Sequence, residues 1–470
     1  MLMRKNVGDS NLKIHAIDRP SVYNTRATPC IIITVKGARR PFHKVLRSTE
    51  AKYEKEKIPM EMEFEFLGGA DMVGRMGMTM KGNGMTMLVE YGLSPTKPPE
   101  FPLPAPKIDH AFLTHAHLDH CGMIPQVCGR YNCELFTTPL SAEVGELMMN
   151  DTLKIAKAED YVQPYTVGDI ERTMRAVVPM KYNDTISLKG VDVTMHDAGH
   201  IPGAAMFEFE KDVKTVYTGD IHTESQRLVG PAKPLDCTNL FIEGTYGGRS
   251  HPSRKETEQR FLAKIEEVIE RGGTVLIPCF AVGRTQEIML LLRNLGYDMW
   301  VDGMGRAVTR LFLDYPEYIK DVKHLKSAKK RFNEVRNGAS RDNARRGDII
   351  VTTGGMLDGG PILGYLKGLK DDPKSAILLV GFQAEDTNGR MLLEQGCVKI
   401  DGDVYPVACE LQRYDFSAHA DHGQLIRFIE KCDPDNVIIM HSDTRDLFLP
   451  DLQDYNVILP ETGKAFHLEV

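Results

Sequence analysis

The chain has 470 residues, of which 42% are hydrophobic and 26% charged, as in a globular protein with a sizeable core. It has no run of about 18 apolar residues, no apolar core of a secretory signal near its start, and no CxxC pairs among its nine cysteines. We therefore expect no membrane span, thiolate zinc site or disulfide framework, but reduced thiols in a cytoplasmic protein. The net charge of −7 does not indicate a nucleic-acid binder, although bound metals would supply local positive charge.

Residues 1–59 differ from the rest of the chain. They are rich in Lys and Arg, and only Cys30–Lys36 has the pattern of a strand. We interpret 1–60 as an accessory segment of unknown role. An alternating strand that ends in glycines, Met60–Gly69, then begins a strand-rich α/β domain. Further strands are predicted at Met85–Glu90, Ile108–Thr114, Val191–His196, Thr215–Tyr217 and Leu240–Ile242.

The pattern changes after Gly248. Thr257–Arg271 has apolar residues on one face and ends at Gly272 and Gly273, which predicts an amphipathic helix. Strands alternating with a helix follow and predict a parallel sheet, whereas the charged stretch Lys323–Arg346 is typical of a solvated surface. The predicted elements are Thr274–Ile277, Arg284–Asn294, Met299–Asp302, Asp348–Thr352, Ser375–Val380 and, near the end, Asn436–Met440.

The strongest chemical signal is a cluster of His115, His117, Asp119 and His120 directly after a predicted strand. Three imidazoles and a carboxylate so close together are costly to fold without a cation, and both side-chain types suit zinc. Alternate side chains of an extended segment share a face, so His115 and His117 are expected to face one metal. Asp119 and His120, beyond the turn, are expected to face a second. The alternative is a His-rich surface loop.

Two metals need more ligands, and three residues at the ends of predicted strands are candidates. They are His200, Asp220 and His441. Loops at strand ends often carry functional groups. Each residue alone is better explained by a structural role, but the metals expected at 115–120 would lack further ligands without these residues.

At this point the sequence resembles a known family. The spacing HxHxDH, with His200, Asp220 and His441, resembles the signature of the metallo-β-lactamase superfamily. Other segments are similar to the β-CASP nucleases, most of all to archaeal homologues of the nuclease subunit of the cleavage and polyadenylation specificity factor. It resembles the type without KH domains, since 1–59 contain no GXXG loop. The matching segments are Phe66–Gly74, Glu243–Gly247, Phe280–Arg284, Thr353–Met356, Tyr414–Asp421 and His441–Asp443.

The resemblance implies an α/β fold: an αββα metallo-β-lactamase sandwich formed by 61–247 and 416–470. Residues 248–415 would form an inserted β-CASP cap with a parallel α/β sheet, and RNA would enter the groove between the two. It also implies two Zn²⁺ per chain. One would be held by His115, His117 and His200, and the other by Asp119, His120 and His441, with Asp220 bridging both.

The same resemblance assigns roles in catalysis. A hydroxide between the two zinc ions would attack the phosphate, and Asp119 would take the proton of that water. His419 would act as general acid and Glu243 would orient it; the alternative for Glu243 is a turn cap. The expected substrate-binding residues are Arg284, Ser417, Thr353, Gly354 and Gly355. For Arg284 the alternative is a helix start on a solvated face.

Two departures from the family pattern stand out. Glu90 in Val89–Gly92 occupies a position where relatives usually carry aspartate, which puts its support of the metal loop in question. His441 is followed by Ser442 and Asp443 rather than Gly and Glu.

Because His441 itself is typical of the RNA-directed branch, we predict a ribonuclease acting on single-stranded RNA in 3′-end processing, maturation or decay. The alternatives are a small-molecule metallohydrolase, disfavoured by the large cap, and an inactive scaffold, disfavoured by the intact ligand set. A homodimer is also plausible by resemblance, since the chain ends in a strand-like segment, Ala465–Val470.

Overall fold

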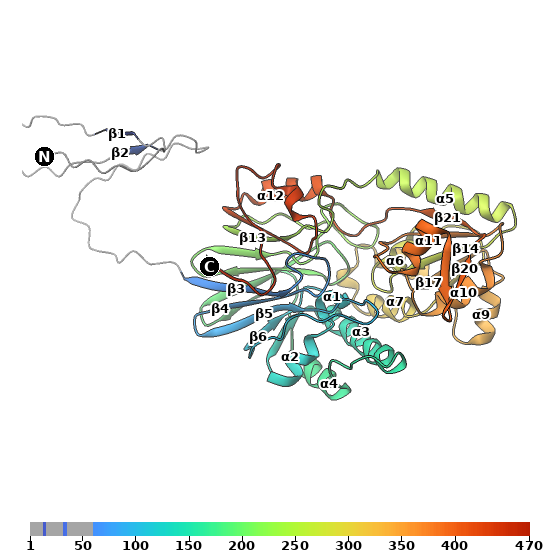
Figure 1. Cartoon of the computed structure of the whole chain (residues 1–470), viewed down its shortest axis with the longest axis horizontal. Coiled ribbons are helices and arrows are strands. Elements are labelled where there is room, and N and C mark those ends of the chain that lie inside the picture. Colours follow the sequence, from blue (N-terminus) through green and yellow to red (C-terminus); the bar gives the residue numbers. More distant parts are fainter. Residues whose placement is uncertain (1–12, 16–31, 35–59) are drawn as a thin grey trace, which may run out of the picture. The chain divides into compact units, whose positions relative to one another are not determined.

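A computed structural model describes residues 13–15, 32–34 and 60–470 (Figure 1). Two short strands, β1 (Lys13–His15) and β2 (Ile32–Thr34), pair antiparallel as a unit of their own. The strand predicted at Cys30–Lys36 therefore lies partly outside the described residues, as does most of the accessory segment. Within the described residues, none of the helices combines the length and apolar character needed to cross a membrane.

The first large sheet has seven strands in the order β24-β3-β4-β5-β6-β7-β8. In β3 the residues Met62, Phe64 and Phe66 are fully buried while the glutamates between them are not, so one face of the strand forms core. The sheet is built from β3 (Glu61–Gly68), β4 (Gly77–Gly82), β5 (Met85–Tyr91), β6 (His110–Phe112), β7 (Glu134–Thr137), β8 (Val177–Pro179) and β24 (Ala465–Glu469).

The second large sheet also has seven strands, in the order β23-β22-β13-β12-β11-β10-β9. Its inner face packs on the first sheet, where Phe64 and Phe112 contact Phe241 and Phe207 respectively at ring distances of 5.1 and 5.2 Å. The strands are β9 (Thr185–Leu188), β10 (Val191–Asp197), β11 (Ala205–Glu210), β12 (Lys214–Tyr217), β13 (Asn239–Glu243), β22 (Asn436–Met440) and β23 (Asn456–Ile458).

Helices cover the outer faces of both sheets. Figure 1 shows α2, α3 and α4 beside the first sheet and α12 beside the second, so the sandwich has the expected αββα layering. The long helix α3 was not predicted from the sequence; Thr138 caps its start by accepting a hydrogen bond from Ser141 N. The helices are α1 (Leu118–Cys121), α2 (Ile124–Tyr131), α3 (Pro139–Ala158), α4 (Val167–Arg175), α12 (His422–Cys432) and the 3₁₀ turn η2 (Arg445–Phe448).

The cap contains a six-stranded, fully parallel sheet in the order β16-β15-β17-β14-β18-β21. Every residue of its central strands β14 and β17 is buried, as expected for a parallel sheet covered on both faces. The strands are β14 (Val275–Cys279), β15 (Met299–Asp302), β16 (Asn333–Glu334), β17 (Ile349–Thr353), β18 (Ala376–Leu379) and β21 (Glu410–Arg413), with a hairpin of β19 (Cys397–Ile400) and β20 (Asp403–Pro406).

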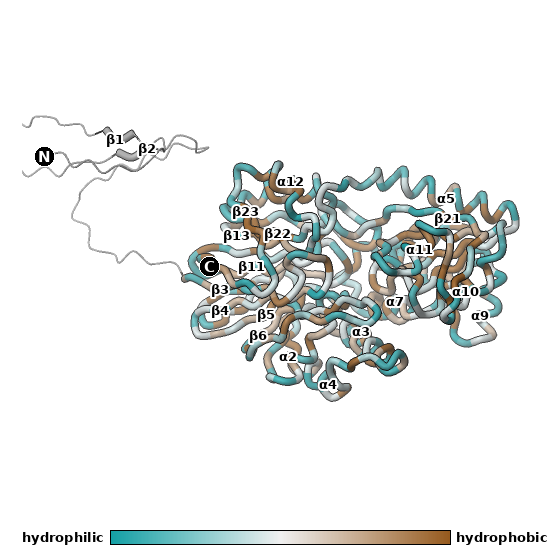
Figure 2. The backbone as a smooth tube through the Cα atoms, viewed as in Figure 1, coloured by the Kyte–Doolittle hydropathy of each residue, from teal (hydrophilic) through white to brown (hydrophobic). Residues whose placement is uncertain are grey.

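Seven helices surround the cap sheet. The predicted helix at Thr257–Arg271 begins one turn earlier, because the Ser253 side chain caps it by accepting a hydrogen bond from Glu256 N. The helices are α5 (Arg254–Glu270), α6 (Arg284–Leu292), α7 (Gly305–Asp314), α8 (Val322–Arg331), α9 (Gly338–Ala344), α10 (Pro361–Leu369) and α11 (Asn388–Gln395), with the 3₁₀ turn η1 (Pro316–Tyr318). Figure 2 shows that apolar segments concentrate on the interior strands.

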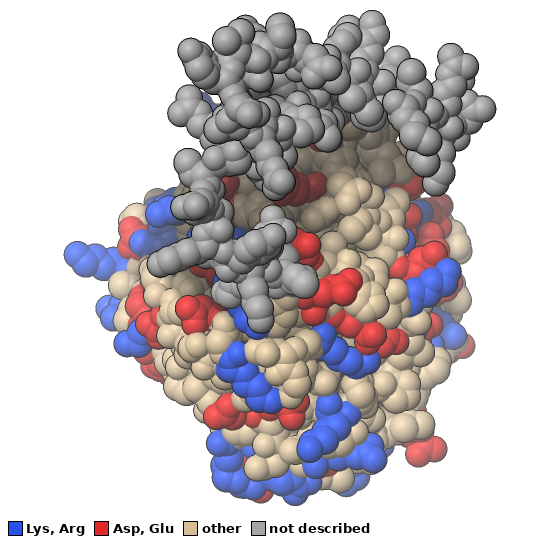
Figure 3. Space-filling view, turned by 90° about the vertical axis from the view of Figure 1, so that its left-hand side faces the viewer, with Lys and Arg blue, Asp and Glu red and all other residues tan. Residues whose placement is uncertain are grey.

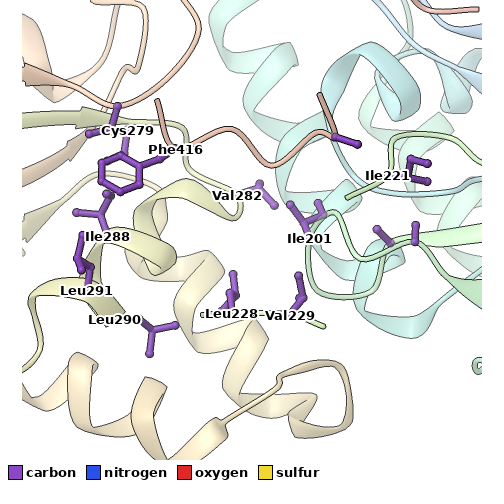
Figure 4. Packing of buried hydrophobic residues seen from close by; sticks show 14 of the residues in the cluster. Ile201, Ile221, Leu228, Val229, Cys279, Val282, Ile288, Leu290, Leu291 and Phe416 are labelled. Atoms are coloured by element: carbon purple, nitrogen blue, oxygen red, sulfur yellow. The ribbon is translucent and has the colours of Figure 1, made fainter. Parts of the chain in front are cut away.

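One hydrophobic cluster runs from the sandwich into the cap. Ile201, Ile221 and Leu228 of the sandwich belong to the same buried cluster as Val282 and Ile288 of the cap (Figure 4). The contact is close: a Cβ added at Gly283 would lie only 2.7 Å from the Ile201 side chain. The carboxyl ends of the cap strands are thereby fixed against the loops of the sandwich, where ligand sites of parallel α/β sheets usually lie.

Candidate metal centre and active site

All seven predicted metal ligands lie beyond strand ends of the sandwich. The loop after β6 carries His115 and His117, and the short helix α1 that follows carries Asp119 and His120. The other three are His200 after β10, Asp220 after β12, and His441 directly after β22. The two sheets therefore bring together residues separated by more than three hundred positions in the sequence.

The first group consists of His115, His117, His200 and Asp220. His117 Nδ1 lies 3.1 Å from His115 Nε2 and 3.2 Å from His200 Nε2. Asp220 Oδ2 lies 3.5 Å from His115 Nε2 and 3.6 Å from His200 Nε2. Four ligands placed tetrahedrally at zinc distances are separated by about 3.3–3.6 Å, so this group has nearly the spacing of a tetrahedral cation site.

The second group consists of Asp119, His120 and His441, next to the same Asp220. Asp119 Oδ2 lies 3.7 Å from His120 Nε2 and 3.6 Å from His441 Nε2. Asp220 approaches both histidines, with Oδ2 at 3.4 Å from His120 Nε2 and Oδ1 at 3.6 Å from His441 Nδ1. The Asp220 carboxylate therefore lies close to the histidines of both groups, as a bridging ligand requires.

Three polar atoms of this centre are left without a partner by the described residues. His120 Nε2, Asp220 Oδ1 and His441 Nδ1 are buried and have no hydrogen-bond partner within the described chain. Burial, together with neighbouring histidines, holds the pKa of both His115 and His200 well below the usual range, which favours the neutral ring that binds metal. The donor set and its unsatisfied atoms thus fit a divalent metal site.

At the second group, neighbouring carboxylates raise a histidine pKa instead of lowering it. Burial lowers the pKa of His120, but the carboxylates of Asp220, Glu90 and Asp119 raise it well above its usual value. Burial raises the pKa of Asp220, since it disfavours the charged carboxylate. The nearby His120, His419 and His441 outweigh burial and hold this pKa well below its usual value. A cation placed among these carboxylates would replace the His120 proton, as expected when metal binding releases protons.

The buried carboxylate of Glu90 orients two of the histidines. Its Oε1 accepts a hydrogen bond from His120 Nδ1 at 2.7 Å and a very short one from the Thr114 hydroxyl. Thr114 Oγ1 in turn lies 2.9 Å from His115 Nδ1, and Tyr217 donates its hydroxyl to Glu90 Oε2 at 2.7 Å. Glu90 thereby fixes the tautomers that leave Nε2 of both histidines facing the cluster. Although glutamate has one methylene more than the aspartate of relatives, the Glu90 carboxylate reaches His120, Thr114 and Tyr217.

A close backbone approach holds the loop against strand β5. A Cβ added at Gly92 would lie 1.8 Å from Asp119 O, so no other residue fits there without a shift of the chain. Met76 N donates to that same carbonyl at 2.8 Å. Asp119 and His120 are therefore positioned by main-chain contacts as well as by Glu90.

His419 and Glu243 form a pair beside the cluster. His419 Nδ1 lies 3.0 and 2.9 Å from the two Glu243 oxygens, and its Nε2 lies 3.8 Å from Asp220 Oδ2. Burial lowers the pKa of His419, but Glu243 and Asp220 outweigh it and raise the pKa to about 9. Glu243 Oε1 also accepts from Ile221 N at 2.8 Å, so it bonds to the next loop as well as to the histidine.

Arg284 is the first residue of α6 and is only partly buried. Its Nε is buried with no partner among the described residues. Burial, together with the nearby charge of Arg254, lowers the pKa of Arg284 to about 10. Because this partly buried guanidinium makes no ion pair with the described residues, the side chain is suited to a negatively charged ligand.

The remaining predicted substrate residues lie at strand ends of the cap. The Ser417 hydroxyl accepts from His419 N at 3.0 Å, which shapes the loop of the histidine. Thr353 ends β17 and is nearly buried; Gly354 has a φ of +107°, a backbone conformation that favours glycine. The carbonyl of Gly355 accepts from Gln383 Nε2 at 2.9 Å. Nothing in these contacts by itself identifies a ligand.

Two further histidines were not recognised from the sequence. His251 lies with Nδ1 3.0 Å from Asp415 Oδ2 and Nε2 3.1 Å from His419 O, so it links two parts of the loop that carries His419. His222 is buried with an unpartnered Nδ1, and burial together with nearby cations lowers its pKa to about 3. The only sequence signal for His222 is its position two residues after Asp220.

Models of three domain families match consecutive parts of the chain. The metallo-β-lactamase superfamily domain matches residues 80–242, and the Beta-Casp domain matches residues 285–392. The Zn-dependent metallo-hydrolase RNA specificity domain matches residues 404–447, which include His419 and His441. Along the chain, the metallo-β-lactamase match comes first, the Beta-Casp match second and the RNA specificity match third.

Three similar proteins come from archaea. "Probable RNase MJ4" of Methanocaldococcus jannaschii is 37% identical over 399 residues, covering 81% of this chain and 93% of the relative. "RNase aCSPSF2" of Saccharolobus solfataricus is 33% identical over 428 residues, covering 87% and 86%. "Transcription termination factor FttA" of Methanocaldococcus jannaschii is 35% identical over 424 residues, covering 80% of this chain and 66% of the relative.

Among solved structures, one of a protein of unknown function from Enterococcus faecalis has a similar fold. It aligns with a TM-score of 0.55 and 14% sequence identity, covering 87% of this chain and 100% of that one. This similarity concerns the fold alone.

Proposed function

Because this chain belongs to the β-CASP family of metal-dependent hydrolases within the metallo-β-lactamase superfamily, we propose that it is a zinc ribonuclease that cuts single-stranded RNA. Relatives named as RNases and the matched RNA specificity domain support RNA as the substrate. A relative named as a transcription termination factor supports a role in 3′-end processing, maturation or decay of transcripts. The proposal extends to the two-metal mechanism, with Zn²⁺ as the metal.

The proposed ligands follow the two groups of the centre. His115, His117 and His200 would hold one ion and Asp119, His120 and His441 the other, with Asp220 between them, which the spacing of 3.1–3.7 Å between donor atoms supports. Two bound zinc ions would supply an activated water and neutralise charge on the phosphate. Asp119 is a carboxylate ligand with 26% of its side chain exposed, and it is the residue proposed to take the proton of the water.

The observation that carries the proposal is the placement of His419. Its Nε2 lies 3.8 Å from the bridging Asp220, while Glu243 holds the opposite nitrogen of the ring. Neither residue is needed to complete the two ligand groups. We assign His419 to proton donation to the leaving 3′ oxygen, and Glu243 to orienting its ring.

The phosphate backbone would be held from the cap side. Arg284 offers a partly buried guanidinium that makes no ion pair within the described chain, and a phosphodiester would supply the anion. Ser417, Thr353, Gly354 and Gly355 are proposed to shape the path of the RNA along the carboxyl ends of the cap strands. The large cap disfavours the alternative, a small-molecule metallohydrolase, because it extends the surface beyond what a small substrate needs.

The homodimer implied by the family resemblance remains a proposal. In the described chain β24 pairs with β3 on one side and forms the edge of the first sheet. An edge strand offers free main-chain groups for pairing with a second copy. Light scattering on the purified protein tests whether the molecule in solution is a dimer.

The test compares RNA labelled at the 5′ end and RNA labelled at the 3′ end, cut by the wild type and by His419→Ala. General acid catalysis contributes about 10²–10⁴-fold, so His419→Ala is expected to be slower by that factor while retaining its zinc. His467→Ala, on the exposed face of β24, is the control and should cut at the wild-type rate. Chelation should abolish cleavage, and added Zn²⁺ should restore it.

The products identify the mode of cleavage. Mononucleotides released from the 5′ end indicate an exonuclease, whereas internal fragments indicate an endonuclease. Cleavage of single-stranded DNA as fast as RNA would contradict the assignment to RNA, and an unimpaired His419→Ala would contradict the role of that residue. Turnover of thioesters or lactones, without cleavage of RNA, would favour the small-molecule alternative.

A further inference from the structure

Helix α8 on the cap is strongly basic. Its sequence, VKHLKSAKKR, contains five lysines and arginines and no aspartate or glutamate. Leu325 and Ala328 are buried and attach the helix to the cap, while Lys326 and Lys330 are exposed. The arrangement is that of an amphipathic helix whose outer face carries charge of one sign.

The outer face of α8 borders a pocket of about 550 Å³. The pocket lies between the helix and the edge strand β16, and its cations are Lys326, Lys329, Lys330 and Arg336. The only carboxylate in its lining is Glu334, which pairs with Arg310 at 2.6 Å and with Arg336 at 3.7 Å. The three lysines therefore give the pocket a positive charge that Glu334 does not offset.

The three lysines of the pocket form no ion pair with the described residues. Lys326, Lys329 and Lys330 make no ion pair or hydrogen bond with any other described side chain or carbonyl, whereas Arg331 is occupied by Leu295 O and Tyr297 O. Like charges three and four residues apart on a helix repel one another. On the sandwich face in Figure 3, in contrast, acidic and basic side chains are interspersed. The α8 pocket thus concentrates positive charge that nothing within the described chain neutralises.

We propose that this pocket, lined by Lys326, Lys329 and Lys330, is a second binding site for the phosphate backbone of RNA, outside the cleavage centre. The inference rests on the proposed function, because that function supplies the polyanion. Lysine ammonium groups bind phosphates as point charges without base specificity, which suits a site that holds any sequence. The site would strengthen the binding of long RNA, which can reach both sites, and would leave the binding of short RNA unchanged.

The position of α8 relative to the centre supports this role. α8 packs on α6, and the first residue of α6 is Arg284, whose charge acts on Asp415 of the His419 loop. Because α6 has nine residues and is only about 13 Å long, we take one long RNA strand to reach both Arg284 and the pocket. A polymer held at one site meets the second at a high effective concentration, which raises affinity without new contacts at the first.

The test uses the full chain with Lys326, Lys329 and Lys330 all changed to alanine. A short oligonucleotide and a long unstructured RNA with the same cleavage site are compared for KM, kcat and salt dependence of binding. Single-strand binding weakens with a slope of about −0.7 per phosphate contact, so loss of three contacts reduces the slope by about 2. Between roughly 50 and 200 mM salt the wild type then loses about 18-fold more affinity than the variant.

Two control variants separate the charge from the fold. A matched triple alanine variant at the exposed Lys154, Lys157 and Lys233 of the sandwich should leave both substrates unaffected. Changing the three α8 lysines to arginine keeps the charge and should retain the affinity for long RNA. The expected result for the α8 alanine variant is a raised KM for long RNA, with unchanged turnover of the short oligonucleotide.

Several outcomes would overturn the inference. One is an unchanged slope and KM for long RNA, and another is an equal loss for long and short RNA. Competition by polyglutamate as strong as by RNA would instead indicate an acidic protein as the ligand of the pocket. Absence of cleavage of either RNA by the wild type contradicts the proposed function itself, which is a separate result from failure of the α8 site alone.

Discussion

Replacement of Glu90 by glutamine tests how the proposed metal ligands are held. The carboxylate is fully buried and accepts hydrogen bonds from His120, Thr114 and Tyr217. Glutamine has nearly the same shape, and the Tyr217 hydroxyl can rotate to accept from its amide. The packing is therefore preserved, and the substitution mainly removes the negative charge behind His120 Nδ1.

The expected effect is on metal affinity. Residues that orient metal-bound histidines typically contribute 10–100-fold, which corresponds to about 1.4–2.7 kcal/mol of binding free energy. Glu90→Gln should therefore raise the Kd for Zn²⁺ by about that factor. Glu90→Asp keeps the charge and tolerates the φ of +62° at this position better than most residues, so its loss of affinity should be smaller.

The assay is titration of the metal-free protein with Zn²⁺ against a coloured chelator, with thermal unfolding of each variant followed by circular dichroism. Asp302→Asn is the matched control. Asp302 is also a buried carboxylate that accepts from a tyrosine, Tyr365, and from a cationic donor, Arg341, but none of its hydrogen-bond donors is a metal ligand. The Asp302→Asn substitution should lower thermal stability and leave the affinity for zinc unchanged. A folded Glu90→Gln with wild-type zinc affinity would refute the orienting role.

Two other substitutions test the site from different sides. Arg284→Met removes a partly buried guanidinium that makes no ion pair with the described residues, so the melting temperature should stay constant or rise while KM for RNA increases about 10-fold or more. A lower melting temperature with unchanged KM would contradict this. Gly92→Ala places a Cβ 1.8 Å from Asp119 O, so metal content measured by elemental analysis should fall sharply. Gly230→Ala, where the added Cβ meets nothing within 4 Å, should retain its metal, and equal metal content in both variants would show that the loop adapts.

The elements with strong local patterns were predicted well from the sequence. The alternation of Glu61–Gly68 and the continuous apolar run of Val275–Cys279 each indicate a strand, because burial of one face or both faces imposes that pattern on neighbouring residues. Helix α3 was missed although it has 20 residues. Its buried positions include small and polar residues such as Ser141, Gly145 and Thr152, which weaken the apolar periodicity.

The sequence by itself determined the kinds of ligand and the strand-end positions at which they occur. HxHxDH is a local pattern, and the resemblance it carries identified the more distant residues His200, Asp220 and His441. Only the tertiary structure decided that Asp220 contacts both groups, that Glu90 reaches His120, and that Arg284 Nε has no partner among the described residues. The reason is physical. Side-chain chemistry and periodicity are properties of neighbouring residues, whereas distance and desolvation depend on the order of strands in two packed sheets.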